Sequence, residues 1–259
     1  MTEFVILLKK EMLEMWRSYK FLWMPVLFLI LGMMQPLSSY YLPDLLEAFG
    51  GLPEGTVLEI PLPSAEEVFV LTLGQFSQVG VIVIVLALMG MFAGERSSGT
   101  AVMVLVKPVS YAKYFLAKWA AASMLIIGSY LIGVAAAFYY IDILFTGLPV
   151  KEFFLAISIY GLWLLFIVSL TLFFSTLLKR TGAIAAVSLI IIIGQSIVTS
   201  VLHDTLSWTP GALSLHAQEM IMGVSAEGLS GSLISSILLV VLMICGGVFY
   251  IRKGYWLQK

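Results

Sequence analysis

Six apolar runs of roughly 20 residues each constrain the fold of this chain more than any other feature. A helix of that length can cross the hydrocarbon core of a bilayer. Of the 259 residues, 61% are hydrophobic and only 11% are charged, whereas about a quarter of the residues in a soluble domain are charged. Because backbone polar groups must be paired within a bilayer, we predict an all-α polytopic membrane protein with a single transmembrane domain over residues 1–259.

The N-terminal segment over residues 1–20 has a different pattern from the apolar runs. Apolar side chains such as Phe4 and Trp16 fall on one helical face, and Lys10 and Glu14 fall on the other. This pattern predicts an amphipathic helix that lies in the membrane interface. The alternative is a signal peptide, but the next apolar run is not followed by a small-residue cleavage site. The predicted spans then cover residues 21–41, 69–93, 114–140, 153–177, 183–202 and 231–250.

Other local signals refine these boundaries. The sequence Ser64-Ala65-Glu66-Glu67 is a capping box, which predicts that the second span's helix begins near residue 65. The polar loop over residues 203–230 is expected on the extracytoplasmic side and to contain a short helix at residues 212–222. Near the end of the second span, Gly90-x-x-x-Gly94 has the spacing that permits close helix contact, although this spacing is common by chance in apolar spans.

The distribution of basic residues predicts the orientation. All of the 14 lysines and arginines except Lys151 lie in residues 1–20, 94–118, 178–182 and 251–259. The alternate loops contain most of the acidic residues. Because cytoplasmic loops carry an excess of lysine and arginine, we expect both termini and the segment between the second and third spans to be cytoplasmic. An even number of spans agrees with this topology.

Residues 94–113 interrupt the apolar pattern between the second and third spans. Gly99 permits a sharp turn, and Thr100 can cap a short helix over residues 101–106. Pro108 ends that helix because it disfavours a helical conformation in the preceding residue. The result would be a rigid lever joined to two spans; the alternative is an ordinary juxtamembrane loop.

This segment resembles the first cytoplasmic loop of ABC-2 type transporter permeases. In that family, a Glu-Arg-x-x-Gly-Thr sequence leads into a leucine-rich helix, a Pro-Val-Ser or Pro-Ile-Ser sequence follows, and a lysine opens the next span. This chain departs from the family pattern at residues 101–104, where the family often has a glutamate and more leucines. The matching positions are Glu95, Arg96, Gly99, Thr100, Leu105, Pro108, Val109, Ser110 and Lys118.

The resemblance implies an ABC-2 (type V) exporter-like fold, with an N-terminal interfacial elbow helix and six transmembrane helices, in the bacterial cytoplasmic (inner) membrane. It also implies that residues 94–113 form a coupling segment that docks on a cytosolic ABC ATPase. Glu95 and Arg96 are expected at the water boundary, where they could pair with a partner's charges. The ATPase-coupling residues implied are Glu95, Arg96, Gly99, Thr100, Leu105 and Pro108.

The chain cannot supply the nucleotide site itself. It contains no Gly-x-x-x-x-Gly-Lys-Ser/Thr sequence, and no lysine is preceded by glycine. We therefore expect the ATPase to be a separate polypeptide present in two copies. Two ATPases need two coupling levers, so the permease is expected to pair with a second copy of itself or with a paralogue.

The spans contain almost no ionisable residue, which suits a hydrophobic or amphipathic substrate such as a lipid, peptide or drug, moved outward. Gln78, Gln195 and Thr199 are candidates for the substrate path, although polar residues in spans more commonly join helices by hydrogen bonds. We expect contact with membrane lipids and none with nucleic acid. The alternative function is an ATP-independent channel, secondary transporter or scaffold, but ion-coupled transporters usually place charges at mid-membrane depth.

No pattern indicates a catalytic, metal or cofactor site. Cys245 is the only cysteine, so neither an intrachain disulfide nor a Cys/His metal spacing is possible. His203 and His216 lie in the second polar loop without the arrangement of a metal site. We therefore predict a non-catalytic subunit that needs no cofactor or metal.

Overall fold

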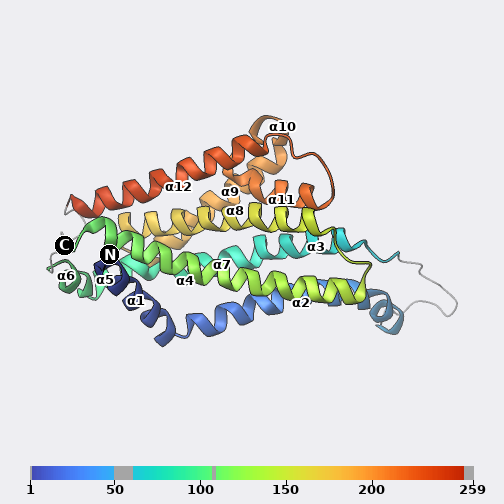
Figure 1. Ribbon diagram of the computed structural model, residues 1–259, viewed down its shortest axis with the longest axis horizontal. Helices are drawn as coiled ribbons and strands as arrows, with labels where there is room; N and C mark the ends of the chain where they lie inside the picture. Colours follow the sequence, from blue (N-terminus) through green and yellow to red (C-terminus); the bar gives the residue numbers. More distant parts are fainter. Residues whose placement is uncertain (1, 50–60, 107–108, 254–259) are drawn as a thin grey trace.

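The computed structural model describes residues 2–49, 61–106 and 109–253, and these residues form helices and no strand. Long helices run side by side along the longest axis of the molecule (Figure 1). The predicted interfacial helix is α1, Thr2–Arg17. It is followed by α2, Lys20–Phe49, after a turn at Tyr19, whose φ of 58° is unusual for a residue other than glycine.

The structure confirms the all-helical class and contains six helical segments that are long and apolar enough to cross a membrane. The third, fourth, fifth and sixth correspond to α7 (Tyr111–Leu144), α8 (Val150–Leu177), α9 (Thr181–Val201) and α12 (Leu229–Arg252). Burial separates central spans from peripheral ones. In the second, third and fourth spans, 56%, 56% and 61% of the most apolar window is buried, against 28%, 28% and 22% in the first, fifth and sixth.

The second span is a succession of helical pieces instead of one regular helix. It consists of α3 (Ala65–Gln75), the π-helical turn η1 (Phe76–Gly80), α4 (Val81–Leu88) and α5 (Gly90–Ser97). The predicted capping box at its start is confirmed: the Glu67 amide donates to the Ser64 hydroxyl, and the Ser64 amide donates to the Glu67 carboxylate.

Glycines bring α2 and α7 into close contact. A Cβ atom on Gly32 would lie 2.1 Å from the carbonyl oxygen of Gly133, and one on Gly133 would lie 2.5 Å from that of Phe28. Neither position can therefore hold a side chain while the helices remain at this separation. By contrast, the Cβ positions of Gly90 and Gly94 have no atom within 4 Å, so the spacing of this pair does not mark a close helix contact among the described residues.

The end of the bundle near α10 (His203–Leu206) is closed by the turn η2 (Pro210–Ala212) and α11 (Leu213–Ile221). This confirms the short helix predicted at residues 212–222. α11 packs against α8 and α3, and its His216 is fully buried. The two ring nitrogens of His216 lie 2.9 Å from the Ser207 carbonyl oxygen and 3.0 Å from the Glu219 carboxylate, which fixes this part of the loop.

Candidate functional site

The last piece of the second span, α5, and the short helix α6 (Thr100–Leu105) that follows it form a helical hairpin. Gly99 makes the turn with a φ of 74°, as the sequence predicted from its conformational freedom. Thr100 is the first residue of α6, and its hydroxyl donates to the Glu95 carbonyl oxygen at 3.3 Å. The structure thus corrects the expected cap: Thr100 ties α6 back to the end of α5 through this oxygen.

This hairpin lies at the same end of the bundle as α1 and the last turns of α12, and opposite to α10 and α11 (Figure 1). The Lys179–Arg180 turn between α8 and α9 also follows the end of α8. The segments that contain most of the basic residues therefore meet at one end, which is the arrangement the charge pattern predicted.

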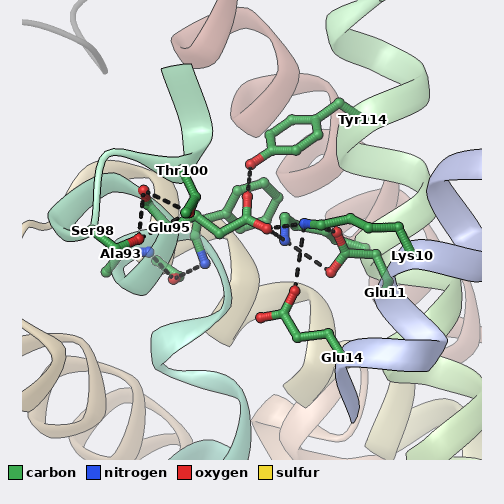
Figure 2. Close-up of polar contacts among 11 residues, drawn as sticks. Lys10, Glu11, Glu14, Ala93, Glu95, Ser98, Thr100 and Tyr114 are labelled. Atoms are coloured by element: carbon green, nitrogen blue, oxygen red, sulfur yellow. Dashed lines mark hydrogen bonds and ion pairs between the residues drawn. The ribbon is translucent and has the colours of Figure 1, made fainter. Parts of the chain in front are cut away.

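Glu95 is the centre of a buried ion cluster at this end. Its side chain is only 6% exposed. The Tyr114 hydroxyl of α7 donates to one carboxylate oxygen. The other oxygen pairs with the ammonium groups of Lys10 from α1 and Lys118 from α7, the latter at 2.9 Å; Figure 2 shows Glu95 between Tyr114 and Lys10.

Glu11 of α1 is the second buried carboxylate of the cluster. It is 2% exposed and lies 2.8 Å from the Lys118 ammonium and 2.9 Å from that of Lys10. Lys118 itself is 1% exposed, and its ammonium also lies over the rings of Phe92 and Tyr114, 5.5 and 5.4 Å from their centroids. The ion cluster, as we use the term below, comprises Lys10, Glu11, Glu95, Tyr114 and Lys118.

Opposite charges balance within this cluster, as burial requires. Burial of Lys10 disfavours its charged form, but the carboxylates of Glu11 and Glu95 outweigh this effect and raise the pKa of Lys10 above its ordinary value of 10.5. Lys10 therefore remains protonated at neutral pH. Carboxylate oxygens of Glu11, Glu14 and Glu95 lie within 4.8 Å of one another. The ammonium groups of Lys10 and Lys118 contact these carboxylates and supply the positive charge that a metal ion would otherwise provide.

The ion cluster changes the interpretation of two predicted coupling residues. Glu95 was expected at the water boundary and available to a partner's charges; its carboxylate is instead buried and occupied by groups of the same chain. Arg96, the next residue, is half-buried, and its Nη1 has no hydrogen-bond partner among the residues that the structure describes. Of the two side chains, that of Arg96 is the more exposed.

Two further predicted coupling residues lie wholly or partly outside the described structure. The backbone of Leu105 ends α6, but its side chain is not among those described. Pro108 lies outside the described residues altogether. Their contribution to coupling stays a prediction from the sequence.

The three residues proposed for a substrate path lie in two places. Thr199 of α9 is 1% exposed, and its hydroxyl lies 3.1 Å from that of Thr209. A Cβ atom on Gly211 would lie 2.8 Å from both Thr199 Oγ1 and Gln195 Cγ, so these two side chains hold α9 against η2. Gln78 lies in η1 and is exposed on the surface of the chain. Of the three, Gln78 is exposed, Gln195 is half-buried and Thr199 is buried.

Sequence reasoning did not identify Glu11, Lys10 or Tyr114 as members of the site. A signal was available for Glu11: it lies four residues after Leu7 and four before Met15, and both are buried. A carboxylate on the apolar stripe of an amphipathic helix requires a buried cation. Lys118, in the apolar third span, could supply that cation.

The similarity of this chain to known proteins extends over all the helices that form the site. The family model described as "ABC-2 family transporter protein" matches residues 5–254, a range that contains nearly all of α1, the α5–α6 hairpin and all six spans. The chain is also 34% identical over 248 residues to a protein of Bacillus subtilis (strain 168) described as "Uncharacterized transmembrane protein YxlG". That similarity covers 95% of this chain and 96% of the relative.

Proposed function

The chain belongs to the ABC-2 family of transporter proteins, and from this premise we propose that the α5–α6 hairpin receives mechanical work from a separate cytosolic ATPase. The chain is then the permease subunit of an ABC transporter and performs no catalysis itself. This proposal requires the hairpin to be rigidly connected to at least one span besides the one it continues, because a flexible loop would absorb the displacement.

The ion cluster is the observation that carries the proposal. Glu95, at the base of the hairpin, is fastened to α1 through Lys10 and to α7 through Lys118 and Tyr114. A force applied to α6 therefore reaches α5, the elbow helix and the third span together. A charged group buried in such a network is costly to separate from its partners, so the three elements should move as one body.

Arg96 offers a contact to the ATPase. Arg96 is half-buried at the base of the hairpin, and a guanidinium binds a carboxylate of a partner by charge-assisted hydrogen bonds. We propose that α6 and Arg96 together enter a groove on the ATPase surface, with this end of the bundle in the cytoplasm of a bacterial cell and the membrane spans in its inner membrane.

The peripheral spans support an assembly with a second permease subunit. α2, α9 and α12 expose large apolar side chains, among them Ile30 (54%), Ile190 (70%) and Ile234 (68%). Lipid covers part of this surface, and a second copy or a paralogue would cover another part. Two permease subunits would present two hairpins to two ATPases.

The proposed substrate is hydrophobic or amphipathic. The described ion cluster lies at one end of the bundle, away from the middle of the membrane, so the central part of the spans offers hydrogen bonds without fixed charge. Gln78 is an exposed amide within an apolar span, and such a group favours contact with a polar path or another subunit over contact with lipid. An ATP-independent channel or secondary transporter is the second candidate function, but the placement of the cluster does not favour it.

The proposal is tested by isolating the permease with a co-expressed ABC ATPase. Gly99→Val should abolish or strongly reduce complex formation, because a β-branched residue is strained at a φ of 74° and would reorient α6. Gly99→Asn should retain most of the complex, since asparagine tolerates this conformation better. Arg96→Gln should weaken binding about tenfold, as expected for one lost charge-assisted hydrogen bond.

Gly94→Ala is the matched control, because its Cβ would meet no atom within 4 Å. Retention of the ATPase in Gly99→Val at the level of Gly94→Ala would contradict the proposed role of the hairpin. So would the absence of any ATPase from the wild-type complex under conditions in which both proteins are folded.

A further inference from the structure

The hydrogen-bond ladder of the second span is interrupted at Met89, between α4 and α5, where a side chain of another helix is inserted. Met89 itself keeps a right-handed helical backbone, and we call this interruption the break. Ser175 of α8 is fully buried, and its hydroxyl donates to the Met89 carbonyl oxygen at 2.9 Å. The Ser175 hydroxyl oxygen also accepts hydrogen bonds from the backbone amides of Phe92 and Ala93, at 3.2 and 3.3 Å. One hydroxyl thus satisfies three backbone groups of the second span.

A side chain of α2 provides a partner for another backbone group near the break. The Lys20 ammonium donates to the Ala87 carbonyl oxygen at 2.7 Å. Lys20 and Trp23 line a cleft of about 470 Å³ together with residues of the break, including Met89 and Gly90. The Cβ position of Gly90 has no atom within 4 Å, so this side of the break is not packed against another helix.

Insertion of a side chain into the hydrogen-bond ladder is a recognised cause of helix kinks. In an apolar span, backbone groups that a kink releases must find other partners. Ser175 and Lys20 provide them here, on two different sides of the helix. The packed side is fixed to α8, a central span, whereas the open side faces the cleft; the arrangement therefore permits α5 to pivot about the break while Ser175 keeps its contacts.

We propose that Ser175 and Lys20 are positioning residues that hold the break at Met89 as a hinge and set the direction in which the α5–α6 hairpin points. The inference rests on the proposed function in one respect: the consequence of misdirecting the hairpin is loss of productive work by the ATPase. The existence of the hinge itself depends only on contacts within this chain.

The ion cluster and the Lys20 contact both connect the second span to the N-terminal helices α1 and α2. Glu95 of α5 pairs with Lys10 of α1, and Lys20 lies at the start of α2, just after the elbow turn at Tyr19. Displacement of α5 would therefore pull on α1, which leads into α2, while Lys20 holds the start of α2 to Ala87 of α4. The Lys20 contact can separate into the cleft during this movement, while Ser175 keeps the pivot in place.

Hydrogen–deuterium exchange of the isolated permease tests the hinge directly. Ser175→Ala removes the acceptor of the Phe92 and Ala93 amides, so exchange in the peptide over residues 89–97 should rise about tenfold. Ser175→Thr keeps a hydroxyl and should restore slow exchange. Ser158→Ala is the matched control, because the Ser158 hydroxyl donates to the Phe154 carbonyl oxygen of its own helix, away from the break.

ATP turnover of the assembled transporter tests the positioning role. Ser175→Ala and Lys20→Met should lower kcat for ATP severalfold, leave KM for ATP unchanged and leave the amount of isolated complex within about twofold of wild type. Unchanged exchange over residues 89–97 in Ser175→Ala would overturn the hinge. Raised exchange with unaltered turnover would overturn the positioning role, whereas failure of the wild-type chain to bind any ATPase would instead overturn the proposed function.

Discussion

At the scale of single residues, Lys118 determines how the hairpin end of the bundle is fastened. Its ammonium pairs with Glu11 of α1 and Glu95 of α5, and its side chain is 1% exposed. Removing one partner from a buried ion pair leaves the other charges unpaired in a medium that solvates them poorly. The cost of losing Lys118 should therefore exceed that of losing a lysine on the surface.

Lys118→Met tests this inference because methionine preserves most of the volume of lysine and removes its charge. The substitution leaves the buried carboxylates of Glu11 and Glu95 with Lys10 as the remaining cation of the cluster. We expect the free energy of unfolding to fall by about 3–5 kcal/mol. The apparent melting temperature of the detergent-solubilised protein should fall by roughly 10 °C. Lys179→Met, in the exposed turn before α9, should leave it unchanged. Equal melting temperatures for the two variants would show that the cluster contributes little to stability.

The sequence predicted some of these residues and could not predict their pairing. Glu95 and Lys118 stood out because they match a family motif. Their direct contact at 2.9 Å depends on the packing of α5 against the bundle, which no local pattern encodes. Burial of Glu95 was predicted wrongly for the same reason: its exposure is determined by α1, whose position on α7 is a tertiary property.

At the scale of helices, the existence of each span was predictable and its internal breaks were not. Hydrophobicity and the capping box located the second span, but the sequence indicated one continuous helix over residues 69–93. The break at Met89 depends on Ser175 and Lys20, which are remote in sequence. The glycine spacing at Gly90 and Gly94 permits close contact but does not show which helix is near, and no atom lies within 4 Å of either Cβ position.

The closest helix contact described above joins α2 and α7 through Gly32 and Gly133, and it gives a prediction for this element pair. Gly133→Ala would place Cβ 2.5 Å from the Phe28 carbonyl oxygen, so the helices must separate. We expect a clear fall in melting temperature, equivalent to about 1–3 kcal/mol. Gly128→Ala, in the same helix with no atom within 4 Å of its Cβ position, should be neutral or slightly stabilising. A neutral effect of Gly133→Ala would mean that α2 and α7 are farther apart in the membrane.

At the scale of the whole molecule, two independent sequence signals predicted the architecture correctly. Apolar run length predicted six spans, and the structure contains six candidates. Basic residues predicted which segments share an end, and α1, α5, α6 and the end of α12 do lie together (Figure 1). These features follow from the solvent properties of a bilayer, which act on whole segments. The ion cluster and the hinge follow from pairwise contacts and required the structure.

The central claim for the whole molecule is that the α5–α6 hairpin contacts an ATPase encoded by another gene. A photo-crosslinking amino acid at Met103, which is 74% exposed on α6, tests it in intact cells. The matched position is Val150, 62% exposed at the start of α8 and at the opposite end of that span from the Lys179–Arg180 turn. We predict an adduct from Met103 with a polypeptide that carries a nucleotide-binding Gly-x-x-x-x-Gly-Lys-Ser/Thr sequence, and none from Val150. An ATPase adduct from Val150 alone, or from neither position while the protein is folded in the membrane, would contradict the account.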